Sequence, residues 1–124
     1  MVHELVMMHG IQRDCCVSSF NHELLAELER LNQFFNTQID TIYLYNYYDN
    51  DELPHPDVYS SLGNGINISS IKLTREVVEI CHAKGKQVGV WIDRDLFCEN
   101  EEFYFTLYSM GVDFFCSDFP HLAI

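Results

Sequence analysis

The feature that most constrains this chain is a regular alternation between two hydrophobic periods. Short, continuous apolar runs, such as residues 87–92, are typical of strands that are buried on both faces. Between these runs lie stretches whose apolar residues recur about every three or four positions, as in an amphipathic helix. Strands that are separated by helices pair in parallel. The pattern therefore predicts an α/β protein, either an open sheet or part of a barrel.

The predicted elements follow each other in the order α-β-α-β-loop-β-α-β-α-β. Asn21 and Thr74 stand where helix N-caps are expected, and Gly10, Gly85 and Gly111 stand where helices are expected to end. Helices are predicted at residues 3–9, 22–32, 75–84 and 99–110, and strands at residues 15–20, 41–47, 66–69, 87–92 and 112–117.

Two further stretches carry expectations of their own. In the second helix, Leu24, Leu25, Leu28 and Leu31 have the spacing of a single face, which predicts a contact with the core. Residues 48–65 form a long irregular stretch, and loops of this length are usually functional or mobile.

The length and the charge limit the classes of function. With 124 residues the chain forms one domain or part of one. Seven Lys and Arg stand against 19 Asp and Glu, which gives a formal net charge of −12. Nucleic acids and anionic membrane surfaces are therefore poor partners, whereas a metal cation or a basic partner fits the charge. No apolar run approaches the roughly 20 residues that a membrane-spanning helix needs.

The cysteines indicate a reducing compartment. Their number is five, which is odd, and it includes the adjacent pair Cys15 and Cys16. Neither property fits a disulfide framework. The N-terminus also lacks the basic region of a signal peptide. We therefore expect reduced thiols in a cytoplasmic protein.

Candidate site residues follow from the parallel architecture, because ligands bind beyond the carboxyl ends of parallel strands. This rule selects Ser19, Phe20, Asn46, Tyr47, Tyr48, Trp91, Asp93, Asp95, Ser117, Asp118 and Phe119. Each of the main candidates has a structural alternative. Ser19 can satisfy the start of the next helix, Asp118 can cap a turn, and Trp91 can fill the core.

Other kinds of chemistry have little support in the sequence. No His-x-x-x-His or Cys-x-x-Cys spacing favours a zinc site, and no glycine-rich loop after a strand favours a nucleotide site. A nucleophilic Cys–His pair stays an open alternative, because neighbours in space need not be neighbours in sequence.

Three motifs resemble the glycerophosphodiester phosphodiesterase family. Residues 73–91 resemble its helix, glycine turn and Val-x-Val-Trp strand, and residues 111–120 resemble its closing strand, which usually ends in Thr-Asp-x-Pro. Residues 17–25 are similar to the Ser-Ser-Phe strand and the helix that follows. The resemblance implies a partial domain over residues 1–124, namely the C-terminal half, strands five to eight, of a (β/α)₈ barrel.

The resemblance also implies an activity and its parts. Members of the family hydrolyse glycerophosphodiesters to an alcohol and glycerol 3-phosphate in lipid metabolism, usually with a divalent metal such as Mg²⁺ or Ca²⁺. The His-Arg-Gly turn, the metal-binding Glu-Asn-Thr stretch and the second catalytic His of the family cannot be placed in this sequence. Glu99-Asn100-Glu101 echoes the Glu-Asn-Thr stretch, but we expect it to open a helix on the wrong side of the fold.

The expected site is therefore a lining without reactive groups. The family resemblance assigns substrate-binding positions to Ser19, Phe20, Trp91 and, more weakly, Asp118, with no catalytic and no metal-binding residue. Phosphodiester cleavage needs charge neutralisation and acid–base groups, so we expect the chain to be inactive alone. The alternative is a non-catalytic half-barrel that binds or regulates a partner. A half-barrel has two open sheet edges, which leaves three possibilities. The sequence is a fragment whose N-terminal half is missing, the half-barrel forms a homodimer, or the sheet rearranges into an open sheet.

Overall fold

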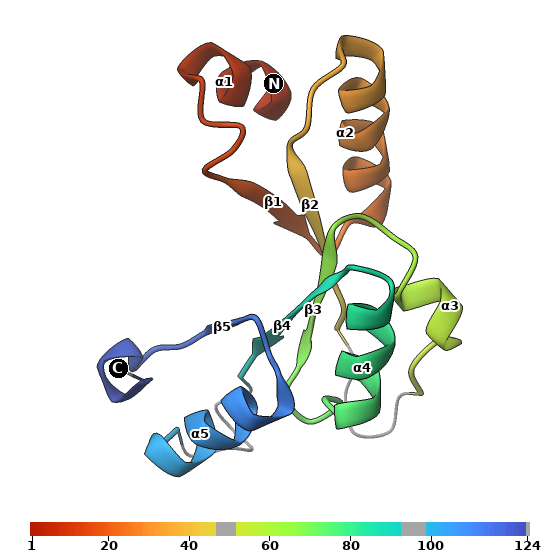
Figure 1. Cartoon of the computed structure of the whole chain (residues 1–124). Helices are drawn as coiled ribbons and strands as arrows, with labels where there is room; N and C mark the ends of the chain where they lie inside the picture. Colours follow the sequence, from red (N-terminus) through yellow and green to blue (C-terminus); the bar gives the residue numbers. More distant parts are fainter. Residues whose placement is uncertain (47–51, 93–98, 124) are drawn as a thin grey trace.

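The structure, a computed structural model, describes residues 1–46, 52–92 and 99–123 and contains one parallel sheet (Figure 1). Its strands lie in the order β1-β2-β3-β4-β5, which is also their order along the chain. A doubly wound sheet reverses its strand order, whereas a βα barrel keeps it. The strands are β1 (Cys16–Ser19), β2 (Asp40–Leu44), β3 (Gly65–Ser69), β4 (Gln87–Trp91) and β5 (Phe114–Cys116).

The helices alternate with these strands, which confirms the predicted element order. Each of the four pairs of neighbouring strands is parallel. The sheet has five strands. The predicted half-barrel, strands five to eight, has only four. The helices are α1 (Val2–His9), α2 (His22–Phe35), α3 (Pro56–Tyr59), α4 (Arg75–Ala83), α5 (Glu101–Met110) and the short 3₁₀ helix η1 (Pro120–Ala123).

The predicted helix caps are present. The Asn21 side chain accepts hydrogen bonds from the backbone N–H groups of Glu23 and Leu24 at the start of α2. Thr74 accepts one from Val77 at the start of α4. The main difference lies at the end of α2, which runs past residue 32 to Phe35. Asn36 ends it in the left-handed conformation with a φ of 53°.

The main core lies between the sheet and the outer helices. Its buried residues include Ile66 and Ile68 of β3 and Val77, Val78 and Cys81 of α4. The set of leucines that α2 buries against the sheet differs from the prediction. Leu25 and Leu28 are buried, but Leu24 is 62% exposed, because the face of α2 that meets β1 and β2 is narrower than the run of four leucines.

The opposite face of the sheet corresponds to the inside of a barrel, since successive strand residues alternate between faces. Asn67 of β3 lies on this inner face and is 4% exposed, and its Nδ2 is 3.9 Å from Cys116 Sγ. The ring of Phe114 covers Gly89 on the same face. The inner face is therefore partly polar and is buried at the middle of the sheet, whereas Cys16 and Ser18 of β1 and Cys116 of β5 are exposed.

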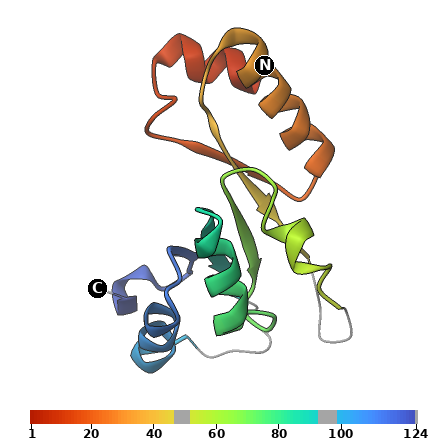
Figure 2. The same cartoon turned by 45° about the vertical axis from the view of Figure 1, so that its right-hand side comes forward.

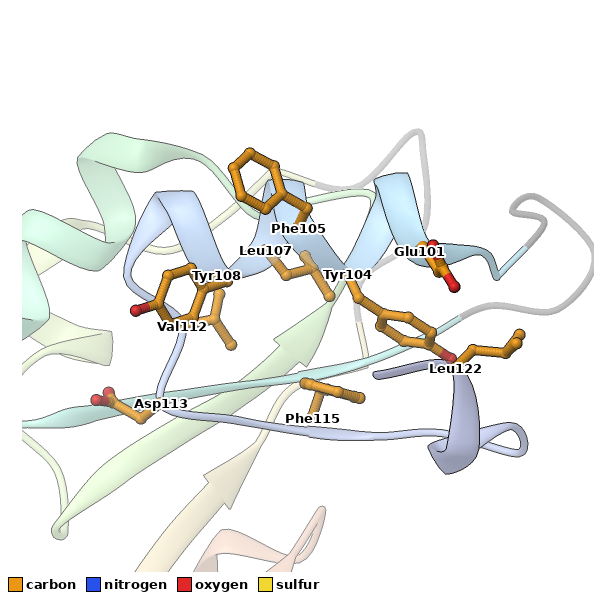
Figure 3. A pocket seen from close by; sticks show the side chains of 9 residues that line it. All are labelled: Glu101, Tyr104, Phe105, Leu107, Tyr108, Val112, Asp113, Phe115 and Leu122. Atoms are coloured by element: carbon orange, nitrogen blue, oxygen red, sulfur yellow. The ribbon is translucent and has the colours of Figure 1, made fainter. Parts of the chain in front are cut away.

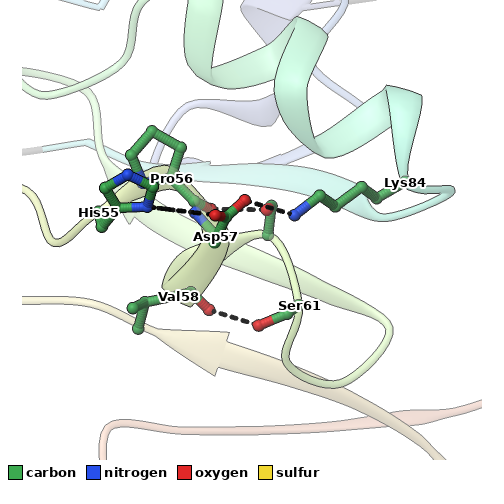
Figure 4. Close-up of polar contacts among 7 residues, drawn as sticks. His55, Pro56, Asp57, Val58, Ser61 and Lys84 are labelled. Carbon is green, nitrogen blue, oxygen red and sulfur yellow. Dashed lines mark hydrogen bonds and ion pairs between the residues drawn. The ribbon is translucent and has the colours of Figure 1, made fainter.

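The stretch between β2 and β3 is more regular than the predicted irregular loop in its described part. The single-turn helix α3 lies there and is tied to the end of α4, because Lys84 Nζ lies 3.1 Å from Asp57 Oδ1 (Figure 4). The Lys84 ammonium, helped by the neighbouring His55, lowers the pKa of the Asp57 carboxyl. The backbone N–H of Asp57 donates to His55 Nδ1 at the start of this helix.

The large exposed apolar side chains lie mainly on the outer helices. They are carried by α1, α2 and α5 and by the segments that follow β1 and β5. Examples are Val2, Leu24, Phe34, Phe105, Tyr108, Phe20 and Phe119. Figure 2 shows α1 with α2 at one end of the sheet and α5 with η1 at the other. Within the described residues no helix is long and apolar enough to cross a membrane.

Candidate functional site

The carboxyl ends of all five strands lie at one edge of the sheet, because every pairing is parallel. Ser19 and Trp91 are the last residues of β1 and β4. Phe20 directly follows β1, and Asp118 follows β5 by two residues. The four residues therefore belong to the same edge, which we call the carboxyl edge. Tyr47, Tyr48, Asp93 and Asp95, also named from the sequence, lie outside the described residues.

Trp91 connects the two halves of this edge. It is half-buried, and its Nε1–H donates to the main-chain oxygen of Tyr45, one residue beyond β2, over 3.1 Å. This hydrogen bond reaches across β3 from β4 to the end of β2. The indole is therefore fixed in orientation by a polar contact as well as by packing.

A shallow pocket of about 410 Å³ continues from Tyr45 toward β1. Phe20, which is 56% exposed, forms part of its wall. The other lining residues come from α2, from the end of β2 and from the segment around α3. They are His22, Leu44, Tyr45, Asn46, Pro54, Val58 and Leu62. Trp91 and Phe20 are thus linked through Tyr45, which contacts the indole and lines the pocket.

His22 lines this pocket, although it is not among the candidate residues selected from the sequence. Its Nε2 lies 2.8 Å from the main-chain oxygen of Leu44. A carbonyl oxygen only accepts, so Nε2 carries the proton and Nδ1 of the neutral ring is an acceptor. The ring also packs edgewise against Tyr43 and Tyr45, with centroids 4.9 Å apart in both cases. Its position directly after the Asn21 cap was the one available sequence signal.

Ser19 has a contact that matches its structural alternative. Its hydroxyl oxygen accepts a hydrogen bond from the backbone N–H of Asn21 over 3.0 Å. Asn21 in turn caps α2. Ser19 therefore shapes the turn that carries Phe20 and His22 into the pocket.

Asp118 belongs to a second polar cluster, which forms around Glu99. The Glu99 carboxylate accepts hydrogen bonds from the Tyr104 hydroxyl and, over 2.7 Å, from the Ser117 hydroxyl. Burial alone would raise the pKa of Glu99. These bonds and those from the backbone N–H groups of Asp118 and Phe119 outweigh burial, so the pKa of Glu99 is lowered. The expectation that Glu99 lies on the wrong side of the fold is wrong, since Ser117 directly follows β5 at the carboxyl edge.

Two of the described cysteines, Cys16 and Cys81, do not fit a nucleophilic role. Burial raises the pKa of the Cys81 thiol to about 11, and burial together with the Asp40 carboxylate raises that of Cys16. A catalytic thiol needs the opposite shift. Cys15, Cys16, Cys81 and Cys116 all carry free thiols, and Cys98 lies outside the described residues.

The described residues also do not fit a metal ion. No three side chains of His, Cys, Asp or Glu in residues 1–46, 52–92 and 99–123 converge so that they could hold one. The Glu99 carboxylate is occupied by hydroxyl and backbone donors. The arrangement at the carboxyl edge thus offers an aromatic wall, an imidazole ring and hydrogen-bonding groups.

Two solved structures share this architecture. A proposed glycerophosphodiester phosphodiesterase from Galdieria sulphuraria matches 98% of this chain and 47% of its own chain, with a TM-score of 0.80 and 29% identity. A proposed glycerophosphoryl diester phosphodiesterase from Silicibacter pomeroyi DSS-3 matches 95% of this chain and 39% of its own, with a TM-score of 0.73 and 22% identity. No family model and no curated protein matches the sequence.

This chain is a half-barrel of the glycerophosphodiester phosphodiesterase fold. The resemblance carried by the three sequence motifs is thereby confirmed at the level of structure. The half-barrel spans less than half the length of either structure that it matches. The assignment of Ser19, Phe20, Trp91 and Asp118 to a substrate site stays a prediction.

Proposed function

We propose that the half-barrel supplies the substrate-lining part of a phosphodiesterase that converts glycerophosphodiesters to an alcohol and glycerol 3-phosphate in glycerophospholipid metabolism. The observation that carries the proposal is the match of 98% of the chain to the Galdieria structure at a TM-score of 0.80. The carboxyl edge adds a position for the substrate, because ligands of βα barrels bind at the carboxyl ends of the strands.

The lining residues take different parts in this proposal. Phe20 and Trp91 form apolar walls that exclude water from one side of the substrate. Ser19 orients Phe20 through the turn before α2. Asp118 lies in the turn held by Glu99 and is the weakest of the four assignments.

The reaction itself requires groups beyond this lining. Cleavage of a phosphodiester needs neutralisation of the phosphate charge and a proton donor and acceptor at the two reacting oxygens. A divalent cation serves the first need in the family, but the described residues do not form a metal-binding group. We therefore propose that the half-barrel alone binds substrate weakly and does not hydrolyse it, since binding without transition-state stabilisation gives no rate enhancement.

The test is an assay of the purified chain with glycerophosphocholine and either Mg²⁺ or Ca²⁺. We expect no turnover by the chain alone. Turnover that survives Trp91→Ala, Phe20→Ala and Asp118→Ala would contradict both the proposed inactivity and the site. Turnover that these substitutions abolish would keep the site and contradict only the inactivity.

A second candidate function is a non-catalytic half-barrel that binds or regulates a partner. The exposed apolar side chains on α1, α2 and α5 favour it. Size-exclusion chromatography with light scattering separates the two readings. A stable, monodisperse monomer without a partner opposes the second candidate.

A further inference from the structure

The turn before β3 carries a dipeptide that is chemically reactive in proteins. The chain has eight asparagines, and Asn64 is the one that precedes a glycine. In such a pair the backbone nitrogen of the glycine can attack the side-chain amide carbon of the asparagine, because glycine has no side chain to hinder the approach. Asn64 is exposed, so that water reaches its side chain, whereas Gly65 is buried as the first residue of β3.

The packing requires glycine on both sides of Asn64. A β-carbon at Gly65 would lie 2.5 Å from the main-chain oxygen of Gln87 on β4. Gly63 has a φ of 55°, and a β-carbon there would lie 2.6 Å from Thr41 Oγ1. The reactive pair at residues 64 and 65 is therefore built into the turn.

Asn64 holds the neighbouring strand through a double hydrogen bond. Its Oδ1 accepts from the backbone N–H of Thr41 over 2.9 Å, and its own backbone N–H donates to the main-chain oxygen of Thr41 over 2.8 Å. The main-chain oxygen of Asn64 accepts from the backbone N–H of Gln87 over 3.0 Å. Asn64 thus ties β2 to β4 at the start of β3.

Asp113 makes the same kind of double hydrogen bond two strands further along the sheet. It lies just before β5 (Figure 3) and binds Val88 of β4. Its Oδ2 accepts from the backbone N–H of Val88 over 2.7 Å, and its own backbone N–H donates to the main-chain oxygen of Val88 over 2.8 Å. A carboxylate therefore serves in this arrangement as well as an amide does.

We propose that Asn64 is a modification site, which deamidates when the turn before β3 opens. The Gly65 nitrogen forms a bond to Cγ of Asn64, and the side-chain nitrogen leaves as ammonia with the proton from the Gly65 N–H, which gives a succinimide ring. One molecule of water then breaks one of the two C–N bonds of the ring and gives aspartate or isoaspartate. No electrons are transferred, and water is the other reactant.

The hydrogen bonds of Asn64 prevent this attack in the folded chain. Ring closure turns Cγ toward the Gly65 nitrogen, so Oδ1 must first leave the backbone N–H of Thr41. The main-chain bonds to Thr41 and Gln87 hold the backbone of Asn64 in place. Lys86 adds a further contact, because its Nζ donates to the main-chain oxygen of Gly63. The rate in the folded chain is therefore set by the local opening of the turn.

The two products differ in their effect on the sheet. Aspartate leaves the main chain unchanged and keeps an oxygen for the backbone N–H of Thr41, as Asp113 does for Val88. Isoaspartate carries the main chain through Cβ and Cγ and adds a methylene between residues 64 and 65. The bonds to Thr41 and Gln87 then cannot both form in register. Isoaspartate should therefore loosen the sheet at the start of β3, whether or not the proposed activity is found.

The experiment is an incubation of the full 124-residue chain in mildly alkaline buffer, followed by digestion and mass spectrometry. The folded chain in sodium chloride is compared with the chain unfolded in guanidinium chloride at the same pH and ionic strength. We expect Asn64 to be the first asparagine modified in the unfolded chain. In the folded chain it should react at least about tenfold more slowly, since an opening free energy of about 1.4 kcal/mol gives that factor.

Two lysine variants test whether the turn itself protects Asn64. Lys86→Gln removes the contact with Gly63 and should raise the rate in the folded chain without changing it in the unfolded chain. Lys84→Gln is the matched control and should leave both rates unchanged, because the Lys84 ammonium binds Asp57 of α3 instead.

The effect on the sheet is measured on the purified isoaspartate form. Asn64→Asp is its control, because the two proteins have the same atoms and the same formal charge and differ only in the path of the main chain. We expect the isoaspartate form to unfold at a lower urea concentration than Asn64→Asp.

Four results would overturn the proposal. The first is an equal rate at Asn64 in the folded and the unfolded chain. The second is earlier modification of another asparagine in the unfolded chain. The third is an equal effect of Lys86→Gln and Lys84→Gln on the rate in the folded chain. The fourth is an equal urea midpoint for the isoaspartate form and Asn64→Asp.

Discussion

The ring of Phe114 on β5 lies directly over Gly89 on β4. A β-carbon added at Gly89 would come within 2.0 Å of Phe114 Cε2. The two residues are register partners in the parallel pair, so the ring fills the space that a side chain of β4 would otherwise take. The inner face between β4 and β5 therefore depends on a glycine and an aromatic residue that fit each other.

Gly89→Ala should destabilise the fold by about 1–3 kcal/mol, the usual range for overpacking in a close-packed region. The loss should shrink strongly in the Phe114→Ala background, because the clashing ring is gone. Urea unfolding of the four proteins of this double-mutant cycle measures the coupling. An equal loss of stability on Gly89→Ala in both backgrounds would show that the contact with Phe114 is not the reason why glycine is needed at position 89.

Most of the fold could be predicted from the chain alone, because its local signals agree with each other. The Asn21 and Thr74 caps, for example, stand where their side chains accept the expected bonds. The end of α2 could not be predicted, since an asparagine such as Asn36 adopts the left-handed conformation only when its surroundings favour it. The exposure of Leu24 depends on the position of two strands and is likewise not local information.

The position of the candidate residues at the carboxyl edge was predictable, but their contacts were not. The rule of carboxyl ends placed Phe20 and Trp91 at one edge correctly. The hydrogen bond from Trp91 to Tyr45 joins residues 46 positions apart, and that from His22 to Leu44 joins residues 22 apart. Sequence spacing carries no signal for such pairs. For the same reason the partner of Glu99, 18 residues away at Ser117, was missed.

Tyr43 should make the fold sensitive to alkaline pH. Burial, together with the charge and the hydrogen bond of Glu29, raises the pKa of Tyr43 from 10 to about 12. The stabilisation is complete below pH 10 and is lost as the pH rises through about 12, by roughly 3 kcal/mol for a shift of this size. Tyr43→Phe should lose this part of the pH dependence. Cys81 titrates in the same pH range, so the measurement compares the stability of the wild-type protein with that of Tyr43→Phe from pH 9 to pH 12. Identical stability profiles of the two proteins would contradict the prediction.

Asn67 carries a buried acceptor without a partner among the residues that the structure describes. Its Oδ1 accepts no hydrogen bond from them, although the residue is only 4% exposed. An unsatisfied buried polar group costs about 1–3 kcal/mol, so Asn67→Leu should raise the free energy of unfolding by about 1 kcal/mol. Asn64→Leu is the matched control and should lower it, because Asn64 Oδ1 accepts from the backbone N–H of Thr41 over 2.9 Å. A lower free energy of unfolding in both variants would mean that the Asn67 amide oxygen accepts a hydrogen bond in solution.

The Glu99 cluster should weaken in acid. The pKa of Glu99 is lowered in the folded state by the bonds from Tyr104 and Ser117, which outweigh burial. The stabilisation is therefore present above about pH 4.5 and is lost as the pH falls through the lower folded-state pKa. Glu99→Gln should reduce stability at pH 7 and flatten the acid limb of the profile. Glu102→Gln, an exposed neighbour in the first turn of α5, should leave both unchanged when thermal unfolding is followed from pH 7 to pH 3.

The sequential strand order has a consequence for how the chain assembles during its synthesis. Each strand pairs with the strand made just before it, so no segment has to wait for a distant part of the chain. As residues emerge from the ribosome, β1 and β2 can meet before β3 is translated, and each later unit adds to a template that already exists. Growth by one unit at a time also means that a gene duplication or a loss of whole units changes the length of the sheet without changing the way its neighbours pair.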